Sequence, residues 1–356
     1  MNTQLLLRSF FSFLPFLMCL FWFIIFVVQY RRLDKAKRML TLYIGTCVVL
    51  YFCHALFFTI GLSYEMECVW TLCSLSVYPL FYGYLCRLTS NEYTMRQQLP
   101  LLLPGAVAAL TKYIFPNVGI DIVRLLLFAI QVVSVCYLGL RRLKKFDHRL
   151  QAVYADTEGR DTKAVYHLLI AIICVSILSG VANSLGKAFF GESLYLLIPI
   201  SLAFTVILYA LIYICYHRDF TIDELIEESK DSETVNEPTV LEDCELIGRK
   251  IEALMKEQQI FLTKNLKITD VVKSIGSNRT YVSNYINNTY HCSFSDYVNQ
   301  LRIEHAKALL LSSDTDTKLS TIAEASGYSS ESAFYRNFQK VTGMTPGEFK
   351  NTRQGE

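Results

Sequence analysis

The stretch GYSSESAFYRNFQKVTGMTP, residues 327–346, has the pattern of a tight turn followed by an amphipathic helix. Gly327 suits the turn, because a positive φ angle costs glycine little. Ser329 or Ser330 then offers a side-chain cap for the following helix. That helix has two aromatic anchors four residues apart, Phe334 and Phe338. Together with a short apolar helix upstream, the pattern predicts a helix–turn–helix motif near residues 319–340.

A second motif of this kind lies earlier in the chain, in the stretch ITDVVKSIGSNRTYVSNYINN, and we place it near residues 268–287. Gly276 marks its turn, and Ser277 or Asn278 caps its second helix. Between the motifs, residues 294–311 contain neither Gly nor Pro and keep a periodic apolar face, which predicts one long bridging helix. One motif alone would be weak evidence, since helical hairpins are common, but two motifs joined by a helix form a specific pattern.

This arrangement, covering residues 246–353, resembles the DNA-binding domain of the AraC/XylS family of transcription regulators. The residues that carry the resemblance lie mainly in the bridging helix and the second motif: Phe294, Tyr297, Val298, Asn299, Arg302, Ala306, Leu309, Leu310, Ile322, Ala323, Gly327, Tyr328, Phe334, Arg336, Phe338, Gly343, Thr345, Pro346 and Phe349. The sequence departs from the family pattern at Val272, Ser277 and Lys350. None of these departures removes a turn or a packing anchor.

The resemblance implies that the second helix of each motif enters the major groove of DNA, with the two helices about one helical turn of DNA apart. It assigns the base-facing positions to eight residues: Arg279, Thr280, Ser283 and Asn284 in the first motif, and Glu331, Ser332, Tyr335 and Arg336 in the second. Arginine can fork to guanine, asparagine can pair with adenine, and glutamate can accept from cytosine. Three lysines would neutralise phosphates: Lys273, Lys318 and Lys340.

The amino-terminal part of the chain has the composition of a membrane protein. Apolar residues make up 52% of the chain and charged residues only 19%, and the apolar residues are concentrated before residue 218. A transmembrane helix needs about 20 apolar residues to cross the hydrocarbon core. Seven blocks qualify, of which the fourth is the weakest: 10–30, 39–62, 69–89, 99–116, 120–140, 164–187 and 193–216. We therefore expect an all-α protein in which a seven-helix transmembrane bundle precedes a domain of two helix–turn–helix motifs joined by a long helix.

The charges of the connections between these blocks indicate their orientation. The connection RRLDKAKR after the first block holds five Lys or Arg residues, the segment from Arg87 to Gln98 holds two, and residues 141–163 hold seven. The connections between them hold none, and the last connection holds only Lys187. Cytoplasmic loops of membrane proteins are enriched in basic residues. The alternation therefore predicts a multi-pass protein of the cytoplasmic membrane, with its amino terminus outside and its carboxyl-terminal domain in the cytosol.

Polar and ionisable residues within spans, or at their outer ends, are candidates for sensing a ligand. Six residues have such positions: His54, Lys112, Asp121, Arg124, Asn183 and Lys187. The alternative for the charged residues near span ends is that their side chains only reach toward the lipid headgroups. Because the outer connections are very short, any signal would have to be met by the spans themselves.

An acidic segment separates the two parts of the chain. The run TIDELIEESKDSETVNEPTVLEDCE holds ten acidic residues and one lysine, which predicts a solvated linker over residues 218–245. Apolar residues then recur at heptad spacing from Val240 to Leu254. This repeat fits a dimerising coiled coil or the first scaffold helix of the next domain, and its short length favours the scaffold helix. The expected domains are therefore a membrane domain (1–217), the linker, and a DNA-binding domain (246–356).

These features predict a membrane-bound, one-component transcription regulator whose spans sense a signal and whose cytosolic domain binds promoter DNA. Its expected partners are double-stranded DNA, the lipid bilayer, a second copy of the chain in a homodimer, and a small-molecule signal. The alternative is a seven-span transporter or solute receptor with a fused DNA-binding domain. An enzyme is not expected, because the chain has no Gly-rich phosphate loop, HExxH motif or nucleophile elbow. No cofactor and no metal site are expected, since no Cys/His set has zinc spacing.

Overall fold

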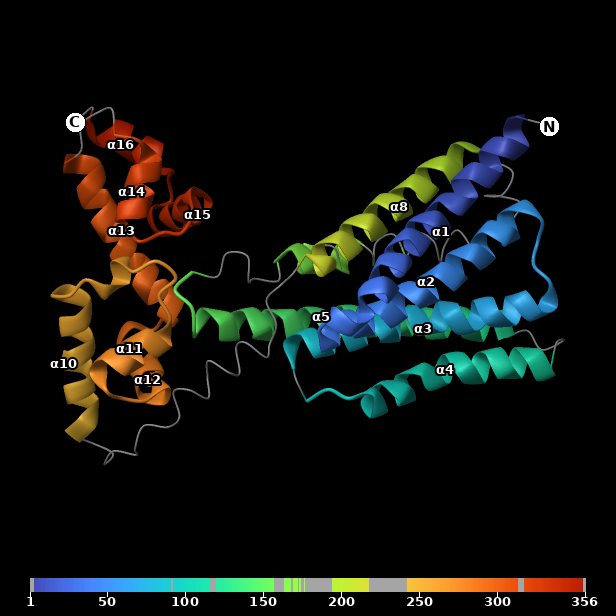
Figure 1. Ribbon diagram of the computed structural model, residues 1–356, viewed down its shortest axis with the longest axis horizontal. Helices are drawn as coiled ribbons and strands as arrows, with labels where there is room; N and C mark the ends of the chain where they lie inside the picture. Colours follow the sequence, from blue (N-terminus) through green and yellow to red (C-terminus); the bar gives the residue numbers. More distant parts are fainter. Residues whose placement is uncertain are drawn as a thin grey trace. The chain divides into compact units, whose positions relative to one another are not determined.

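The computed structural model describes residues 3–90, 92–115, 120–156, 163–167, 169–171, 173, 176, 194–217, 242–312 and 317–354. Within these ranges the regular elements are helices, and the only β contact is an isolated antiparallel bridge between Tyr154 and Lys267. The chain divides into two compact units (Figure 1). We call them the apolar unit (1–145 and 162–222) and the polar unit (146–161 and 223–356).

The apolar unit consists of long helices. Its described helices are α1 (Thr3–Gln29), η1 (Tyr30–Arg32), α2 (Lys35–Thr59), α3 (Tyr64–Thr89), α4 (Met95–Ile114), α5 (Ile120–Gln151) and α8 (Leu194–Tyr216). Helix α1 packs against α2 and α8, α2 packs against α3, and α3 packs against α4. Helix α2 begins after Asp34, whose carboxylate accepts a hydrogen bond from the amide of Lys37 at 2.7 Å. Helix α5 continues past the end of this unit, so its last turns belong to the polar unit.

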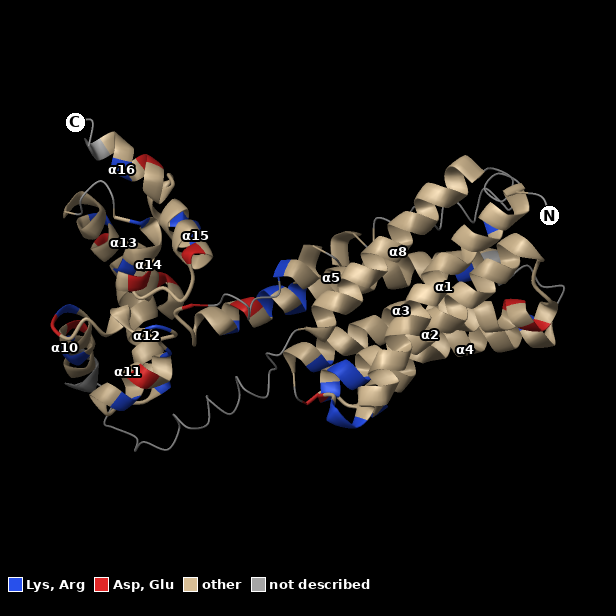
Figure 2. Ribbon diagram, turned by 45° about the horizontal axis from the view of Figure 1, so that its top comes forward, with Lys and Arg blue, Asp and Glu red and all other residues tan. Residues whose placement is uncertain are grey.

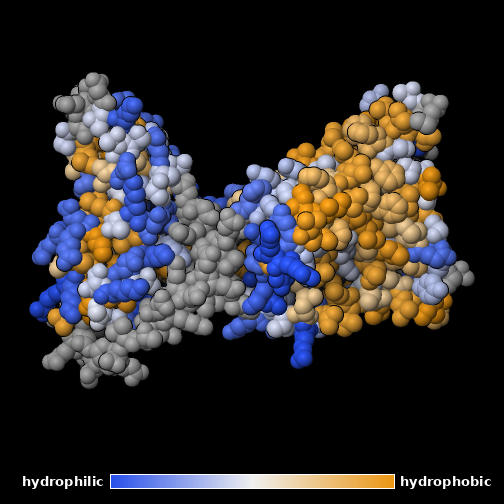
Figure 3. All heavy atoms as spheres, viewed as in Figure 1, coloured by the Kyte–Doolittle hydropathy of each residue, from blue (hydrophilic) through white to orange (hydrophobic). Residues whose placement is uncertain are grey.

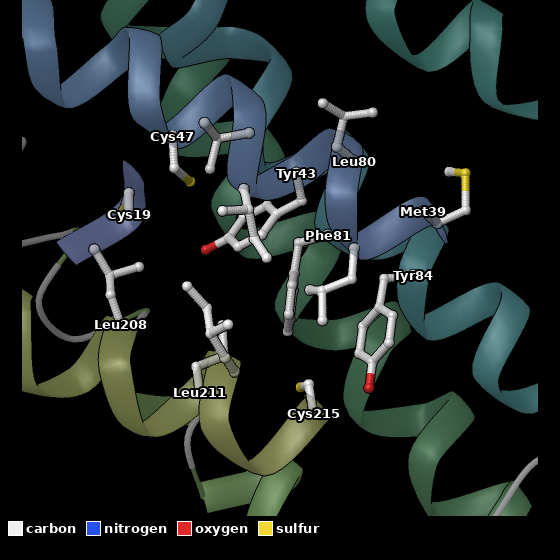
Figure 4. Packing of buried hydrophobic residues seen from close by; sticks show 14 of the residues in the cluster. Cys19, Met39, Tyr43, Cys47, Leu80, Phe81, Tyr84, Leu208, Leu211 and Cys215 are labelled. Atoms are coloured by element: carbon white, nitrogen blue, oxygen red, sulfur yellow. The ribbon is translucent and has the colours of Figure 1, made fainter. Parts of the chain in front are cut away.

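The core of the apolar unit lies where α1, α2, α3 and α8 meet. Figure 4 shows buried aromatic and aliphatic side chains there, interleaved with small thiol side chains. The labelled residues include Cys19, Tyr43, Cys47, Phe81, Tyr84, Leu208, Leu211 and Cys215. These cysteines are free thiols, which act here as small apolar packing residues.

Five described helices are long and apolar enough to cross a membrane, judged by length and composition alone. They span Thr3–Arg32, Lys35–Thr59, Tyr64–Thr89, Ile122–Gln151 and Leu194–Tyr216, and they coincide with five of the seven predicted blocks. The fourth block forms α4, which is helical but is not among these five. The sixth block, 164–187, lies largely outside the described residues. The count of seven spans therefore stays a prediction.

The surface of the apolar unit matches this composition. Figure 3 shows apolar side chains over most of the visible face of the unit. Figure 2 shows that charged residues are sparse along its helices and gather mainly at their ends. Large apolar side chains such as Phe21, Val28 and Ile130 are more than half exposed on single helices, as expected of helices that face lipid.

The polar unit is built from shorter helices around two helix–turn–helix motifs. Its described helices are α10 (Glu242–Lys256), η2 (Ile260–Leu262), α11 (Ile268–Ile275), α12 (Arg279–Tyr290), α13 (Phe294–Ser312), α14 (Leu319–Ala325), α15 (Glu331–Thr342) and α16 (Pro346–Gln354). Helices α11 and α12 form the first motif, and α14 and α15 form the second. Helix α13 is the predicted bridging helix and ends one residue beyond the expected boundary. It packs against α12 on one side of the domain and against α14, α15 and α16 on the other.

Helix α10 is a scaffold helix of this domain. Three of its heptad-spaced apolar residues, Ile247, Ile251 and Leu254, are buried. The helix packs against α11, α12 and η2 within the same unit. The described part of the apolar stripe that also fitted a dimerising coiled coil is therefore covered by the domain itself. The predicted acidic linker before this helix lies almost entirely outside the described residues.

Candidate nucleic-acid interface

The first motif turns at a glycine and begins its second helix at an asparagine. Gly276 ends α11 with a φ of +65°, a left-handed conformation that few other residues adopt at low cost. Asn278 then caps α12, because its side-chain oxygen accepts a hydrogen bond from the amide of Tyr281 at 3.0 Å. The neighbouring Ser277, which was the alternative cap, is buried. The buried side of α12 carries Val282, which fixes the opposite side toward solvent.

The second motif also turns at a left-handed glycine and caps its second helix with a side chain. Gly327 has a φ of +82°, and a Cβ atom there would lie 2.7 Å from the carbonyl oxygen of Leu262. The close backbone approach therefore requires glycine for space as well as for conformation. Ser330 caps α15, accepting from the amide of Ala333 at 3.1 Å. Phe334 is fully buried and anchors α15, as the sequence pattern predicts.

The predicted base-facing residues lie on the outward sides of α12 and α15. In α12, Thr280 and Asn284 are exposed, and Arg279 and Ser283 are half-buried. In α15, the exposed residues are Glu331, Ser332 and Arg336, and Tyr335 is half-buried. Each helix thus presents a compact set of donors and acceptors on its solvent side. This is the arrangement that reading base edges in a groove requires.

The phenol of Tyr335 is set up as a hydrogen-bond donor. Burial, and next the nearby Glu331 carboxylate, raise the pKa of Tyr335 above its ordinary value. The ordinary pKa of a tyrosine, about 10, already keeps the hydroxyl protonated at neutral pH, and the upward shift acts in the same direction, so the hydroxyl can donate to a phosphate or base acceptor.

The three predicted phosphate-binding lysines differ in their surroundings. Lys273 and Lys318 are exposed at the surface of the domain. Lys340 instead forms an ion pair with Asp296 of α13, with 2.6 Å between its Nζ and the carboxylate Oδ1. Burial opposes ionisation of Asp296, but hydrogen bonds from Lys340 and Ser293 hold its pKa below the usual value. Contact of Lys340 with a phosphate would therefore compete with this pair.

A buried arginine joins the two motifs, a role that was not predicted from the sequence, where this residue only helped to carry the resemblance. Arg302 of α13 is fully buried and donates from Nε to the carbonyl of Phe261 at 2.6 Å and from Nη2 to that of Thr263 at 2.8 Å. Its guanidinium lies 5.3 Å from the ring centroid of Tyr328 in the second motif. A sequence signal was present, because Arg302 lies four residues from both Val298 and Ala306 in the buried stripe of the helix.

Three of the six candidate sensing residues are described in detail, and two of them meet at one tryptophan. The guanidinium of Arg124 lies 4.8 Å from the ring centroid of Trp70. The ring of His54 lies 5.4 Å from the same indole. Lys112 instead forms an ion pair with Glu67 at 3.0 Å. Trp70 was not among the predicted sensing residues, since aromatic side chains are common in membrane helices.

The other three candidate sensing residues fall outside the described part of the chain, wholly or by their side chains. Asn183 and Lys187 lie outside the described residues, as does the side chain of Asp121. Among the described residues, no group of three or more His, Cys, Asp or Glu side chains is arranged to hold a metal ion.

Two helix–turn–helix motifs joined by one bridging helix define a DNA-binding domain of a transcription regulator. A family model described as a helix-turn-helix domain matches residues 271–352 of the chain. The carboxyl-terminal part of the chain is an AraC-type helix–turn–helix domain, which confirms the resemblance found in the sequence.

Several curated proteins are similar to the same part of the chain. The melibiose operon regulatory protein of Escherichia coli (strain K12) is 30% identical over 112 residues, which cover 30% of this chain and 36% of that protein. The uncharacterized HTH-type transcriptional regulator YijO of Escherichia coli (strain K12) is 26% identical over 143 residues, covering 36% of this chain and 50% of YijO. YtdP, an uncharacterized HTH-type transcriptional regulator of Bacillus subtilis (strain 168), is 30% identical over 89 residues, covering 25% of this chain and 11% of YtdP.

These matches are partial. The chain spans about a third of the melibiose operon regulatory protein and half of YijO. No solved structure gives a significant match to the chain.

Proposed function

We propose that this protein is a membrane-bound, one-component transcription regulator without enzymatic activity. The observation that carries the proposal is the presence, in one chain, of an AraC-type domain with two outward-facing polar helices and of five helices apolar enough to span a membrane. In this function the spans sense a signal, and the cytosolic domain binds promoter DNA from the inner face of the membrane. The basic connections after the first, third and fifth predicted blocks support that orientation.

The proposed reading of DNA divides between α12 and α15. Arg279 and Arg336 recognise guanine by forked hydrogen bonds, and Asn284 recognises adenine. Glu331 accepts from cytosine, and Thr280, Ser283, Ser332 and Tyr335 supply the remaining contacts. Lys273 and Lys318, which are exposed, neutralise phosphates and set the register of the domain on the duplex.

The small net charge of the DNA-binding domain supports binding of DNA by two copies of the protein. Residues 246–356 hold 14 Lys or Arg against 11 Asp or Glu, which is a small excess for a DNA-binding domain. Since phosphate neutralisation drives affinity that does not depend on sequence, one domain alone binds moderately and with strong sensitivity to salt. A homodimer formed through the spans raises the effective concentration of the second domain. Control of dimer geometry is then a way for the membrane part to regulate binding.

The proposed sensing site is the group formed by His54, Trp70 and Arg124. A cation, an imidazole and an indole brought together in a predicted span region offer both hydrogen bonding and aromatic contact to a small polar ligand. This same group favours the second candidate function, a solute receptor or transporter with a fused DNA-binding domain.

The proposal is tested by genome-wide DNA crosslinking of the tagged full-length protein in its own cells. The test variant carries Arg279→Ala and Arg336→Ala. The matched control carries Lys256→Ala and Lys307→Ala, which remove the same charge from surfaces that carry none of the proposed DNA contacts. Discrete peaks that persist in the control and disappear in the test variant support the regulator. Solute uptake by vesicles containing the protein, without such peaks, supports the second candidate instead.

A further inference from the structure

A short piece of the chain that follows α5 is built into the DNA-binding domain. Sequence organisation assigns residues 141–163 to a basic connection between two predicted spans, but residues 146–161 group with the polar unit. Within them, residues 153–156 (the 153–156 segment: Val153, Tyr154, Ala155 and Asp156) are buried, with at most 6% of any residue exposed. Burial of four consecutive residues, including an aspartate, indicates a specific docked segment.

The segment pairs by its backbone with the strand-like residues just before α11. The amide of Ala155 donates to the carbonyl of Leu266 at 3.0 Å, and the amide of Ile268 donates to the carbonyl of Val153 at 2.8 Å. Ile268 is the first residue of α11, so its amide has no acceptor inside the helix. The 153–156 segment therefore satisfies a free helix-terminal amide of the first motif.

The same segment is held by the bridging helix. The carbonyl of Ala155 accepts from the Oγ of Ser295 and from the Nδ2 of Asn299, each at 2.8 Å. Both side chains are buried on α13. Without the segment, these two buried donors would lose this acceptor, which is costly inside a protein.

The segment also contacts the second motif. The carboxylate of Asp156 accepts a hydrogen bond from the hydroxyl of Ser329. Ser329 immediately precedes Ser330, the residue that caps α15. Burial lowers the pKa of the Arg302 guanidinium, and the nearby Tyr328 and Asp156 oppose that shift. One four-residue segment thus contacts the first motif, the bridging helix and the second motif.

On this basis, and resting on the regulator function proposed above, we propose that the 153–156 segment couples helix α5 to the two DNA-reading helices. Helix α5 is continuous from Ile120 to Gln151, so the segment begins two residues after the helix ends. A rotation or shift of α5 therefore moves the 153–156 segment and disturbs its contacts with the first motif, the bridging helix and the second motif. Helices α12 and α15 have to enter successive major grooves together. Loss of the contacts that the 153–156 segment makes with both motifs therefore lowers the affinity for DNA. The docked segment is the DNA-binding state, and its withdrawal is the inactive state.

Hydrogen exchange of the full-length protein in lipid nanodiscs tests the contact itself. The test variant is Asp156→Ala, and Asp156→Asn is its conservative partner, since an amide oxygen still accepts from Ser329. Glu304→Ala, on an exposed part of α13, is the control. We expect faster exchange in Asp156→Ala in peptides covering both 262–270 and 326–334, with near normal exchange in the other two variants. Faster exchange confined to 326–334 would overturn the proposal, because the segment would then not link the motifs.

Promoter occupancy in cells tests the regulatory consequence. We expect Asp156→Ala to lose at least fivefold in occupancy at the crosslinked sites, and Asp156→Asn and Glu304→Ala to keep it. Unchanged or raised occupancy in Asp156→Ala overturns the coupling role. Loss of peaks only in Asp156→Ala and in the Arg279→Ala, Arg336→Ala variant supports both proposals. If the arginine variant keeps its peaks, the DNA-reading proposal fails by itself, and the exchange experiment still decides the docking of the segment.

Insertions in α5 separate coupling from simple stabilisation. One alanine inserted between Lys144 and Lys145 rotates the following residues by about 100° relative to the span, whereas seven alanines restore the phase to within about 20°. We expect the single insertion to change promoter occupancy at least fivefold and the seven-residue insertion to restore it. Equal occupancy in both insertions and in the unmodified protein would show that α5 transmits nothing through the segment.

Discussion

Arg302 of the bridging helix donates to the carbonyl of Phe261 at 2.6 Å, and this bond connects the bridging helix to the segment that precedes the first motif. The guanidinium is fully buried, and a second bond of 2.8 Å reaches the carbonyl of Thr263. Buried carbonyls that lose a charged donor are left without solvent to replace it. These two hydrogen bonds explain why a charged residue lies in the apolar stripe of α13.

Replacement of this arginine is expected to destabilise the domain. Arg302→Ala leaves the carbonyls of Phe261 and Thr263 without this charged donor and should cost on the order of 3 kcal/mol, which is about a hundredfold faster exchange of amides that open with the whole domain. Arg302→Lys keeps the charge and one donor and should cost about half as much. Hydrogen exchange of α13 peptides in the full-length protein measures both. Equal exchange in Arg302→Ala and in the surface control Lys307→Ala would refute the expectation.

In the described part of the polar unit, three glycines are left-handed, Gly276, Gly327 and Gly343, and we expect them to tolerate alanine unequally. A left-handed conformation costs an alanine about 1–2 kcal/mol wherever it occurs. A Cβ at Gly276 or Gly343 meets nothing within 4 Å, so this cost should be the whole effect. At Gly327 the Cβ would also lie 2.7 Å from the Leu262 carbonyl, so the backbone of η2 must move. Gly327→Ala should therefore lower domain stability most, as measured by hydrogen exchange of α14 and α15. If Gly276→Ala proved equally damaging, the close approach to Leu262 would not be the cause.

The Asp296–Lys340 pair is expected to make stability sensitive to acid. The pKa of Asp296 is lower in the folded protein than in the unfolded chain, whose value is about 3.9. The folded state thus binds fewer protons, so the contribution of the pair is present above about pH 4 and is lost as pH falls through the lower folded pKa. Because both side chains are partly exposed, we expect less than about 1 kcal/mol. Thermal unfolding from neutral pH to pH 3 should show this loss in the unmodified protein and not in Asp296→Asn.

Base contacts and phosphate contacts are expected to differ in their effect on specificity. Arg279→Ala should weaken binding to the preferred duplex by about 1–3 kcal/mol and lower discrimination at one base pair. Lys273→Ala should weaken binding to all duplexes alike and reduce the slope of log affinity against log salt by about 0.9. Titration of fluorescent duplexes, taken from crosslinked sites and altered one base pair at a time, measures both. A uniform loss in Arg279→Ala would remove Arg279 from the base-reading set.

Local patterns allowed much of the polar unit to be predicted from the sequence. The glycines at 276 and 327 and the helix caps follow rules that involve only neighbouring residues. The uninterrupted apolar periodicity of residues 294–311 likewise predicts α13 to within one residue of its end. The proposed DNA-reading residues were instead carried over by position from the family resemblance, and their role stays a prediction.

Contacts between residues far apart in the chain could not be predicted in this way. Asp156 lies in a basic, polar connection, and nothing in its own neighbourhood indicates that it meets Ser329, 173 residues later. Tertiary packing likewise pairs Lys340 with Asp296 and Arg124 with Trp70. Local periodicity therefore predicts whether a residue lies on the surface of its helix. It does not predict which distant residue that side chain contacts.

The ion pair that occupies Lys340 gives a last prediction, in which removal of an acidic residue strengthens DNA binding. In the folded domain Lys340 is 62% exposed, yet its ammonium is held by Asp296. Lys340→Ala should therefore change affinity little, because the lysine contributes little charge to the phosphates while it is paired. Asp296→Asn releases the lysine and removes a negative charge from the same surface.

We expect Asp296→Asn to bind duplex DNA more tightly and with a salt slope steeper by about 0.9, the value for one added phosphate contact. The double variant Asp296→Asn, Lys340→Ala should return to the original slope, because the released cation is gone. Fluorescence anisotropy across a series of salt concentrations measures these slopes in the full-length protein. If Lys340→Ala alone lowers the salt slope by as much as Lys273→Ala, the prediction is wrong. Lys340 would then leave Asp296 and contact a phosphate when DNA binds.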